Sequence, residues 1–124
     1  MDETSRQLEE LAARGRRYPL DAYLFILAAL EHMLQRLGER RHLTGQELSE
    51  GIRTFALERY GLMARTVLES WNCHTTDDFG NLVYDMIGAG IMSKTPEDRL
   101  EDFHAVYDFG AAFERGYELG QSPE

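Results

Sequence analysis

Cysteine is nearly absent from this sequence, which holds a single one, Cys73, in 124 residues. One thiol excludes a disulfide within the chain. It also leaves no Cys-x-x-Cys pair of the kind that anchors structural zinc. Nothing else in the sequence indicates a metal or a cofactor. We therefore expect a fold that depends on a hydrophobic core.

Proline and flexible linker sequence are also scarce. The chain has three prolines and no long tract of serine or glycine, which argues against a linker and a second domain. About 43% of its residues are hydrophobic, which is typical of a globular protein. We predict a helical N-terminal extension over residues 1–17, one globular domain over 18–119 and a tail over 120–124.

Long apolar segments are missing as well. The longest unbroken run, Ala22 to Leu30, has nine residues, whereas a membrane-spanning helix needs roughly 20. The N-terminal stretch MDETSRQLEELAARG is polar and acidic, unlike a signal peptide. These observations predict a cytoplasmic protein that does not associate with a membrane.

Positive charge is missing from the second half of the chain. Residues 1–65 hold ten Lys or Arg and ten Asp or Glu, whereas residues 66–124 hold three and twelve, so the net charge of −9 arises there. Binding to duplex DNA requires Lys and Arg that neutralise phosphates. The imbalance argues against a DNA-binding surface in the second half.

What the sequence does contain is a series of amphipathic segments with capping residues at their starts and glycines at their ends. Helices are predicted over Thr4 to Gly15, Asp21 to Leu37, Thr44 to Tyr60, Leu62 to Trp71, Thr75 to Gly90 and Asp108 to Gly120. Gly51 lies in the middle of the third helix, where it costs about 1 kcal/mol relative to alanine. That cost indicates that another helix crosses closely at this position.

Three short strands are predicted between the helices, at His42 to Thr44, Ile91 to Lys94 and Phe103 to Tyr107. The last two would form a hairpin around the turn TPEDRLED. The order of elements predicts an α-rich α+β fold, with a winged-helix-like helical core, a small three-stranded antiparallel sheet and flanking N- and C-terminal helices. The alternative is an all-α bundle in which the three strands are loops.

Four motifs give the sequence a resemblance to a small bacterial family of unknown function. They are HLTGQEL (His42 to Leu48), TTDDFG (Thr75 to Gly80), GIMSKT (Gly90 to Thr95) and DFHAVYDF (Asp102 to Phe109). The resemblance covers residues 18 to 110 and keeps the order of the motifs. It implies a bacterial, cytoplasmic, single-domain protein, and it implies no activity, cofactor or substrate.

The fifth predicted helix would be the DNA-reading helix of a winged-helix protein. Its expected solvent face shows Asp77, Asp78 and Asp85, together with Asn81, which could read a base. Three carboxylates facing phosphates make sequence-specific DNA binding an unfavourable interpretation. As structural groups, these acids would cap the helix and keep it soluble.

Basic residues gather instead in the first half. Arg14, Arg16 and Arg17 precede the second helix, and Arg36, Arg40, Arg41 and His42 follow it or end it. Brought together, they would form a positive surface for RNA, an anionic ligand or an acidic partner. Taken separately, they would satisfy helix dipoles and terminal carbonyls. Trp71, at a helix end, is a further candidate binding residue if it is partly exposed.

A candidate chemical site lies between Cys73 and Asp78, where a thiol, His74 and two carboxylates are close in sequence. Adjacent side chains in a loop usually diverge, which disfavours both a metal site and a nucleophile–base pair. No phosphate-binding loop, dinucleotide fingerprint or Gly-x-Ser-x-Gly elbow is present. The sequence therefore identifies no catalytic, cofactor-binding or metal-binding residue.

The function that these features favour is a non-enzymatic protein–protein interaction module that can associate with itself through its uneven charge. One alternative is a protein that binds RNA or another nucleic acid through the basic residues of the first half. Another is an enzyme with a site near Cys73 to Asp78.

Overall fold

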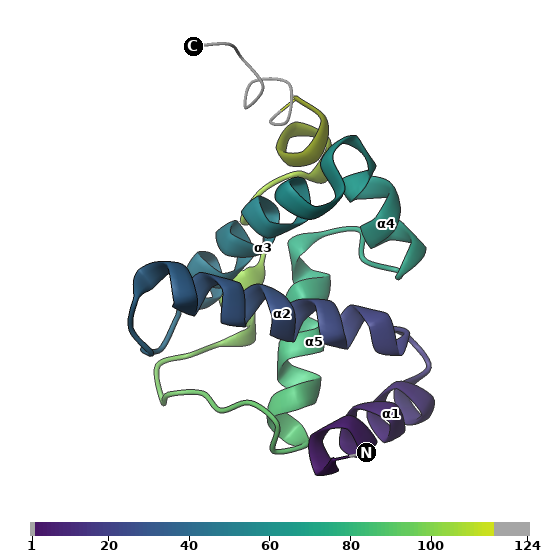
Figure 1. Ribbon diagram of the computed structural model, residues 1–124, viewed down its shortest axis with the longest axis vertical. Helices are drawn as coiled ribbons and strands as arrows, with labels where there is room; N and C mark the ends of the chain where they lie inside the picture. Colours follow the sequence, from purple (N-terminus) through teal and green to yellow (C-terminus); the bar gives the residue numbers. More distant parts are fainter. Residues whose placement is uncertain (1, 116–124) are drawn as a thin grey trace.

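The computed structural model describes residues 2–115, and in these residues the chain folds entirely from helices and connecting loops (Figure 1). Five α-helices are described: α1 (Glu3–Gly15), α2 (Leu20–Leu37), α3 (Gly45–Tyr60), α4 (Ala64–Ser70) and α5 (Thr76–Gly88). Short 3₁₀ turns, η1 (Gly61–Met63) and η2 (Leu100–Phe103), and a π-helical segment, η3 (Gly110–Arg115), complete the elements.

The predicted three-stranded sheet is wrong, and the all-α alternative fits the structure. Residues 41–44, 91–95 and 104–108 are turns and loops. Local side-chain hydrogen bonds replace a ladder: Asp98 accepts from the backbone N–H of Thr95, and Asp102 accepts from that of Arg99. Such local side-chain hydrogen bonds to the backbone compete with strand pairing. Ile91 donates its N–H to the carbonyl of Met86, so this segment continues the end of α5.

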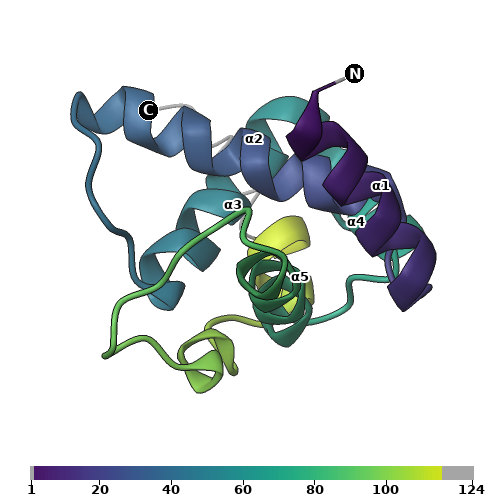
Figure 2. The same cartoon turned by 90° about the horizontal axis from the view of Figure 1, so that it is seen from below.

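Helix α5 occupies the middle of the molecule. Seen nearly end-on in Figure 2, it is surrounded by α1, α2, α3 and the segment that follows it. Its buried residues lie on several sides of the helix: Thr76, Asp78, Phe79, Gly80, Leu82, Val83 and Met86. The winged-helix interpretation gave this helix a broad solvent face, and that expectation is corrected by its central position.

The close helix crossing predicted at Gly51 is confirmed. A Cβ at Gly51 would lie 1.7 Å from Sδ of Met33, so α3 meets α2 where a side chain has no room. The capping box of Thr44 and Glu47 at the start of α3 is confirmed as well. A cluster of Phe25, Tyr60 and Trp71 also joins α2 to the end of α3 and to the residue that follows α4.

Two predicted caps differ from the structure. The N-cap of α1 is Asp2, which accepts from the N–H of Ser5, so Thr4 lies inside the helix. Helix α2 begins at Leu20 after Pro19, so Asp21 lies in its first turn. Proline fixes φ near the value that precedes a helix, which explains the earlier start. Leu8 and Leu11 of α1 join the common core.

The segment after α5 is held by one aromatic side chain. Phe103, which is buried, lies against Gly45 of α3 and Gly80 of α5: Cβ atoms at these glycines would lie 3.1 Å and 2.9 Å from it. The hydroxyl of Thr76 donates to the carbonyl of Phe103 at 2.6 Å and accepts from the N–H of Val106. This anchor fixes residues 91–109 against the helices.

The chain then enters η3, where the carboxylate of Asp108 accepts from the N–H of Ala111 at 3.0 Å. The predicted cap at Asp108 is thereby confirmed. The remainder of that predicted helix, including Tyr117 and the stop at Gly120, lies outside the described residues, as does the predicted tail over 120–124.

Candidate functional site

Asp78 joins the start of α5 to the loop between α1 and α2. Its side chain accepts from the N–H groups of His74 and Thr75, at 2.7 Å and 3.2 Å, and from the hydroxyl of Tyr18. Arg17 lies 3.5 Å away. Only 5% of Asp78 is exposed. This carboxylate is therefore a structural group that caps α5, and it is not presented to a partner as the sequence interpretation expected.

The other two acids of α5 also have partners within the chain. Asp77 lies 3.0 Å from Nδ1 of His104, and Asp85 accepts from the hydroxyl of Tyr23 at 2.8 Å. Burial and the hydrogen bond to Asp85 raise the pKa of Tyr23, which keeps that hydroxyl protonated. The three acids thus tie α5 to its neighbours at three separate points.

Cys73 and His74 point in different directions. Cys73 is buried, whereas His74 is exposed and lies 3.1 Å from the side-chain oxygen of Asn72. Burial raises the pKa of the Cys73 thiol to about 12, and the charge of Asp78 adds to the shift. A thiol that stays protonated at neutral pH is a poor nucleophile. Within residues 2–115, no group of three or more His, Cys, Asp or Glu side chains is arranged to hold a metal ion.

The basic residues form two separate groups. Arg14, Arg16 and Arg17 lie before the start of α2, while Arg36, Arg40 and Arg41 lie at its end. The groups lie at opposite ends of α2, whose 18 residues correspond to a length of roughly 27 Å. The fold therefore does not assemble the single positive surface on which the RNA interpretation depends.

The second basic group is paired with acids. Arg36 lies 3.2 Å from Glu58, Arg40 lies 3.3 Å from Glu31, and Arg41 lies 3.2 Å from Glu47. Trp71, the remaining candidate, is half-buried against the rings of Phe25 and Tyr60. Its packing is that of a core residue at the edge of the molecule.

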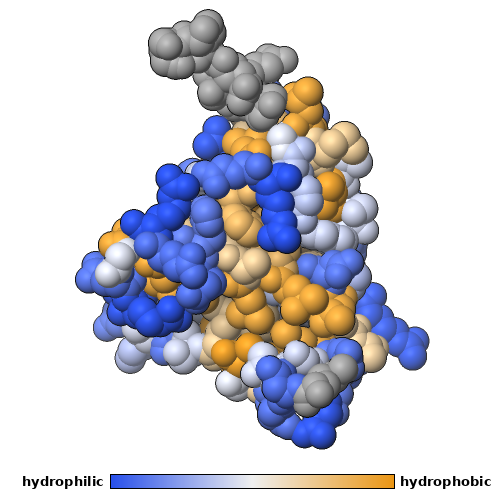
Figure 3. Space-filling model, in the orientation of Figure 1, coloured by the Kyte–Doolittle hydropathy of each residue, from blue (hydrophilic) through white to orange (hydrophobic). Residues whose placement is uncertain are grey.

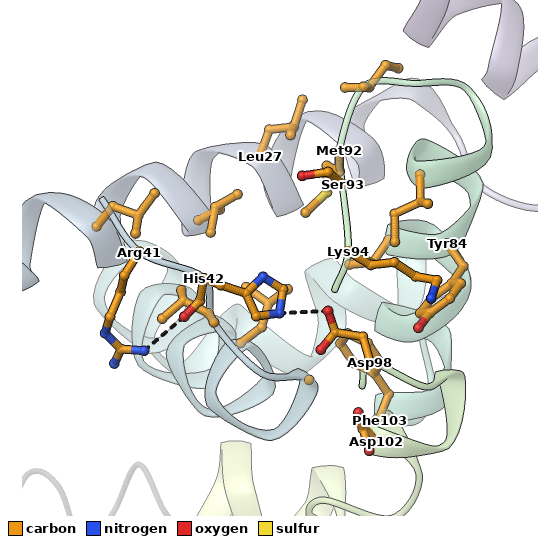
Figure 4. Close-up of a pocket in the computed structure, with 18 of the residues that line it drawn as sticks. Leu27, Arg41, His42, Tyr84, Met92, Ser93, Lys94, Asp98, Asp102 and Phe103 are labelled. Carbon is orange, nitrogen blue, oxygen red and sulfur yellow. Dashed lines mark hydrogen bonds and ion pairs between the residues drawn. The ribbon is translucent and has the colours of Figure 1, made fainter. Parts of the chain in front are cut away.

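A groove of about 650 Å³ lies between α2, the start of α3, α5 and the segment 91–103 (Figure 4). We call it the α2–α5 groove. Its lining combines apolar side chains from the helices with charged side chains at the edge: Leu27, Leu30, Glu31, Leu34, Arg40, Arg41, His42, Leu43, Gly45, Leu48, Val83, Tyr84, Ile87, Ile91, Met92, Ser93, Lys94, Asp98, Arg99, Asp102 and Phe103.

One polar contact bridges the mouth of the groove. Nε2 of His42 lies 2.7 Å from Oδ2 of Asp98, which joins the loop before α3 to the segment after α5 (Figure 4). The carboxylate of Asp98 has a lowered pKa: burial acts to raise it, but the hydrogen bonds from Thr95 and His42 outweigh burial. His42 thus fixes one wall of the groove.

Another polar group of the groove, the hydroxyl of Tyr84, has no hydrogen-bond partner among the described residues. The hydroxyl oxygen of Tyr84 is buried, and within residues 2–115 it forms no hydrogen bond. Burial and the nearby charges of Asp98, Asp102 and Glu101 raise the pKa of Tyr84, so the hydroxyl is a donor at neutral pH. Buried polar groups are normally hydrogen-bonded, which marks this one as a candidate contact for a ligand.

Sequence reasoning included Arg40, Arg41 and His42 among the candidates but missed Tyr84, Lys94 and Arg99 at the same groove. One signal was available: Lys94 is the only lysine of the chain, and it stands inside the GIMSKT motif. The sequence pattern predicts a strand over Ile91 to Lys94, and a strand at this position gave no reason to expect a binding site there.

Comparison with known proteins adds no assignment. No family model matches the chain, and no curated protein and no solved structure matches it. The resemblance to a bacterial family therefore stays a prediction. None of the helices within residues 2–115 has both the length and the apolarity that are needed to cross a membrane.

Proposed function

We propose that the protein is a non-enzymatic interaction module that associates with a second copy of itself through the outer side of α2. The observation that carries the proposal is an apolar ridge on this helix. Leu24 is 44% exposed, and Leu20 and Ala28, one turn before and after it, are half-exposed. Figure 3 shows apolar surface across the middle of this face, with hydrophilic surface at its edges.

The ridge is complementary to itself. Residues spaced by four form the ridges that interlock when two helices cross in the commonest packing class. When two copies of α2 pack antiparallel about Leu24, each Leu20 lies opposite Ala28 of the other copy. Such a two-fold contact uses the same surface on both chains.

Charge also supports an antiparallel pair. Arg17 stands seven residues before Leu24, and Glu31 stands seven residues after it. Antiparallel packing about Leu24 brings Arg17, in the loop before α2, toward Glu31 of the other copy. In that pair Arg17 exchanges or shares its contact with Asp78, and Glu31 its contact with Arg40. Both side chains are at least half exposed, at 63% and 50%. Opposite charges at the rim of an interface fix its register and speed association.

Sedimentation velocity over a range of protein concentrations tests this proposal. One helix pair buries less than the roughly 800 Å² per partner of a standard interface. We therefore expect a reversible dimer with a dissociation constant on the order of micromolar or weaker. Leu24→Glu is expected to leave only monomer. The matched control is Leu100→Glu, at a site that is 43% exposed and outside the ridge, which is expected to dimerise normally.

Charge reversal tests the register. Glu31→Arg alone places like charges opposite each other and is expected to weaken the dimer, whereas the double variant Arg17→Glu with Glu31→Arg is expected to restore it. A wild-type chain that stays monomeric at all concentrations, or a dimer that survives Leu24→Glu, would contradict the proposal. We also propose a cytoplasmic location, which is supported by a single buried cysteine that forms no disulfide.

A further inference from the structure

The α2–α5 groove has the size and the floor of a small-molecule site. Its volume of about 650 Å³ lies within the range of roughly 300–1,000 Å³ that is typical of ligand sites. Leu27 and Leu30 of α2, Ile87 of α5 and Met92 of the following segment supply apolar surface. The apolar floor favours the apolar part of a ligand. The charged side chains at the edge determine which polar group the ligand carries.

The edge of the groove is positive in a chain that is otherwise acidic. Four of the 13 Lys and Arg residues line it, but only three of the 22 Asp and Glu residues do. Nζ of Lys94 contacts the carbonyl oxygen of Thr95 at 3.3 Å, and within the described chain neither Lys94 nor Arg99 forms an ion pair. Two cations are thus available to a ligand.

The acids of the groove are engaged by the chain. Oδ2 of Asp98 accepts from the N–H of Thr95 at 2.7 Å and lies at the same distance from His42. Oδ2 of Asp102 accepts from the N–H of Arg99 at 3.0 Å. Glu31 pairs with Arg40. The negative groups therefore already have partners, whereas Lys94 and Arg99 offer only donors and the buried hydroxyl of Tyr84 has a proton to donate.

We propose that the α2–α5 groove binds a small amphipathic carboxylic acid. Its apolar body lies on Leu27, Ile87 and Met92, and its carboxylate accepts hydrogen bonds from Lys94, Arg99 and the hydroxyl of Tyr84. A carboxylate is the matching group because it carries negative charge and only accepts hydrogen bonds. A neutral alcohol lacks the charge, and an amine repels the edge.

Decanoate is a suitable probe, with 1-decanol and decylammonium as matched neutral and cationic compounds. Because Lys94 is the only lysine, reductive ¹³C-methylation leaves one lysine signal for NMR, which retains its positive charge. We expect decanoate to shift this signal saturably and to bind at least about tenfold more tightly than 1-decanol. Octanoate is expected to bind roughly tenfold more weakly than decanoate, because two fewer methylenes are buried.

Two variants test the polar end. Tyr84→Phe keeps the ring and removes the hydroxyl, so we expect severalfold weaker binding of decanoate with no loss of thermal stability, because that hydroxyl has no partner in the chain. Lys94→Gln with Arg99→Gln is expected to remove the preference for decanoate over 1-decanol. The matched control, Arg14→Gln, changes an exposed arginine outside the groove and is expected to bind decanoate as the wild type does.

Equal affinity for decanoate and 1-decanol would overturn the proposal, as would binding that leaves the Lys94 signal unmoved. No saturation by decanoate at about 1 mM, a concentration at which even a weak complex forms, would overturn it too. So would tight binding of an acidic peptide in place of decanoate. The Leu24→Glu variant leaves the groove intact and is expected to bind decanoate normally, so this result is independent of self-association.

Discussion

The side chain of Phe103 occupies the space that a side chain on Gly80 would need. A Cβ built at Gly80 would lie 2.9 Å from three atoms of Phe103, closer than real contacts allow. A Cβ at Gly45 would meet the same ring at 3.1 Å. Three of the four sequence motifs therefore meet at one point: HLTGQEL supplies Gly45, TTDDFG supplies Gly80, and DFHAVYDF supplies Phe103. The fourth motif, GIMSKT, lines the adjoining groove.

Gly80→Ala is predicted to destabilise the protein by about 1–3 kcal/mol, because it overpacks a filled site. Gly88→Ala is the matched control in the same helix: nothing lies within 4 Å of the added Cβ. That substitution is predicted to stabilise by up to about 1 kcal/mol through helix propensity. Urea unfolding measures both changes.

The clash at Gly80 has a specific partner, which a double variant tests. Phe103→Ala removes Cγ and Cδ2, two of the three atoms that the new Cβ would meet, so combining it with Gly80→Ala is expected to cost less than the sum of the two single changes. Strict additivity of the two costs would contradict the packing described for Phe103.

Ser49→Ala is predicted to leave stability unchanged or to raise it by up to about 1 kcal/mol. The hydroxyl of Ser49 is fully buried and forms no hydrogen bond in the described chain. A buried donor without a partner carries its desolvation cost, which alanine removes. Thermal unfolding followed by circular dichroism measures the change. A loss of more than about 1 kcal/mol would show that this hydroxyl has a partner in solution.

Cys73 is predicted to resist alkylation in the folded protein. Its pKa of about 12 means that almost no thiolate is present at about pH 8, where an ordinary cysteine reacts readily. Iodoacetamide followed by mass spectrometry is expected to label Cys73 slowly in buffer and rapidly in urea. Fast labelling without denaturant would show that the loop around Asn72 opens.

Glu47→Gln is predicted to weaken the protein at neutral pH more than in acid. The pKa of Glu47 is lowered, first by its hydrogen bond from Arg41 and then by the backbone N–H of Thr44. A lowered carboxyl pKa contributes stability above the ordinary pKa and loses it as pH falls through the lowered value.

Because glutamine can still accept from Thr44, the substitution removes charge and keeps the cap. Urea midpoints at neutral pH and at about pH 3 are expected to show the difference shrinking in acid. Glu50→Gln, on the same helix and in no ion pair with a residue that the structure describes, serves as the control. An effect of Glu47→Gln that is equal at both pH values would contradict the assignment.

Helices were predictable because their signals are local. Thr44 and Glu47 predict the start of α3. Gly51 predicts a close helix crossing, because a glycine inside a helix lowers its stability and is expected where a neighbouring helix leaves no room for a side chain. The segment after α5 was not predictable in the same way. Ile91 and Val106 have strand propensity, but the hydroxyl of Thr76, thirty residues before Val106, takes the backbone group that a strand would have paired.

The candidate site was only partly accessible from the sequence for the same reason. Arg41 and His42 are visible as a basic cluster, but their neighbourhood depends on where residues 91–103 dock. Tyr84 carries no signal in the sequence: it stands at helical spacing among core residues, and only the fold shows that its hydroxyl lacks a partner. The two basic groups both belong to the first half of the sequence, but they lie at opposite ends of α2 and do not form one surface.

The space that Gly45 and Gly80 leave for the side chain of Phe103, which we call the glycine slot, also suggests an order of folding steps. Gly45 and Gly80 belong to α3 and α5, so the slot exists only after these helices have packed together. We therefore expect Phe103 to dock after these helices have packed together, and its undocking to free residues 91–103 from the helices. We expect these residues to exchange their amide hydrogens through such local openings, while the helices exchange only through global unfolding. One wall of the α2–α5 groove would then open and close on a structure that otherwise remains folded.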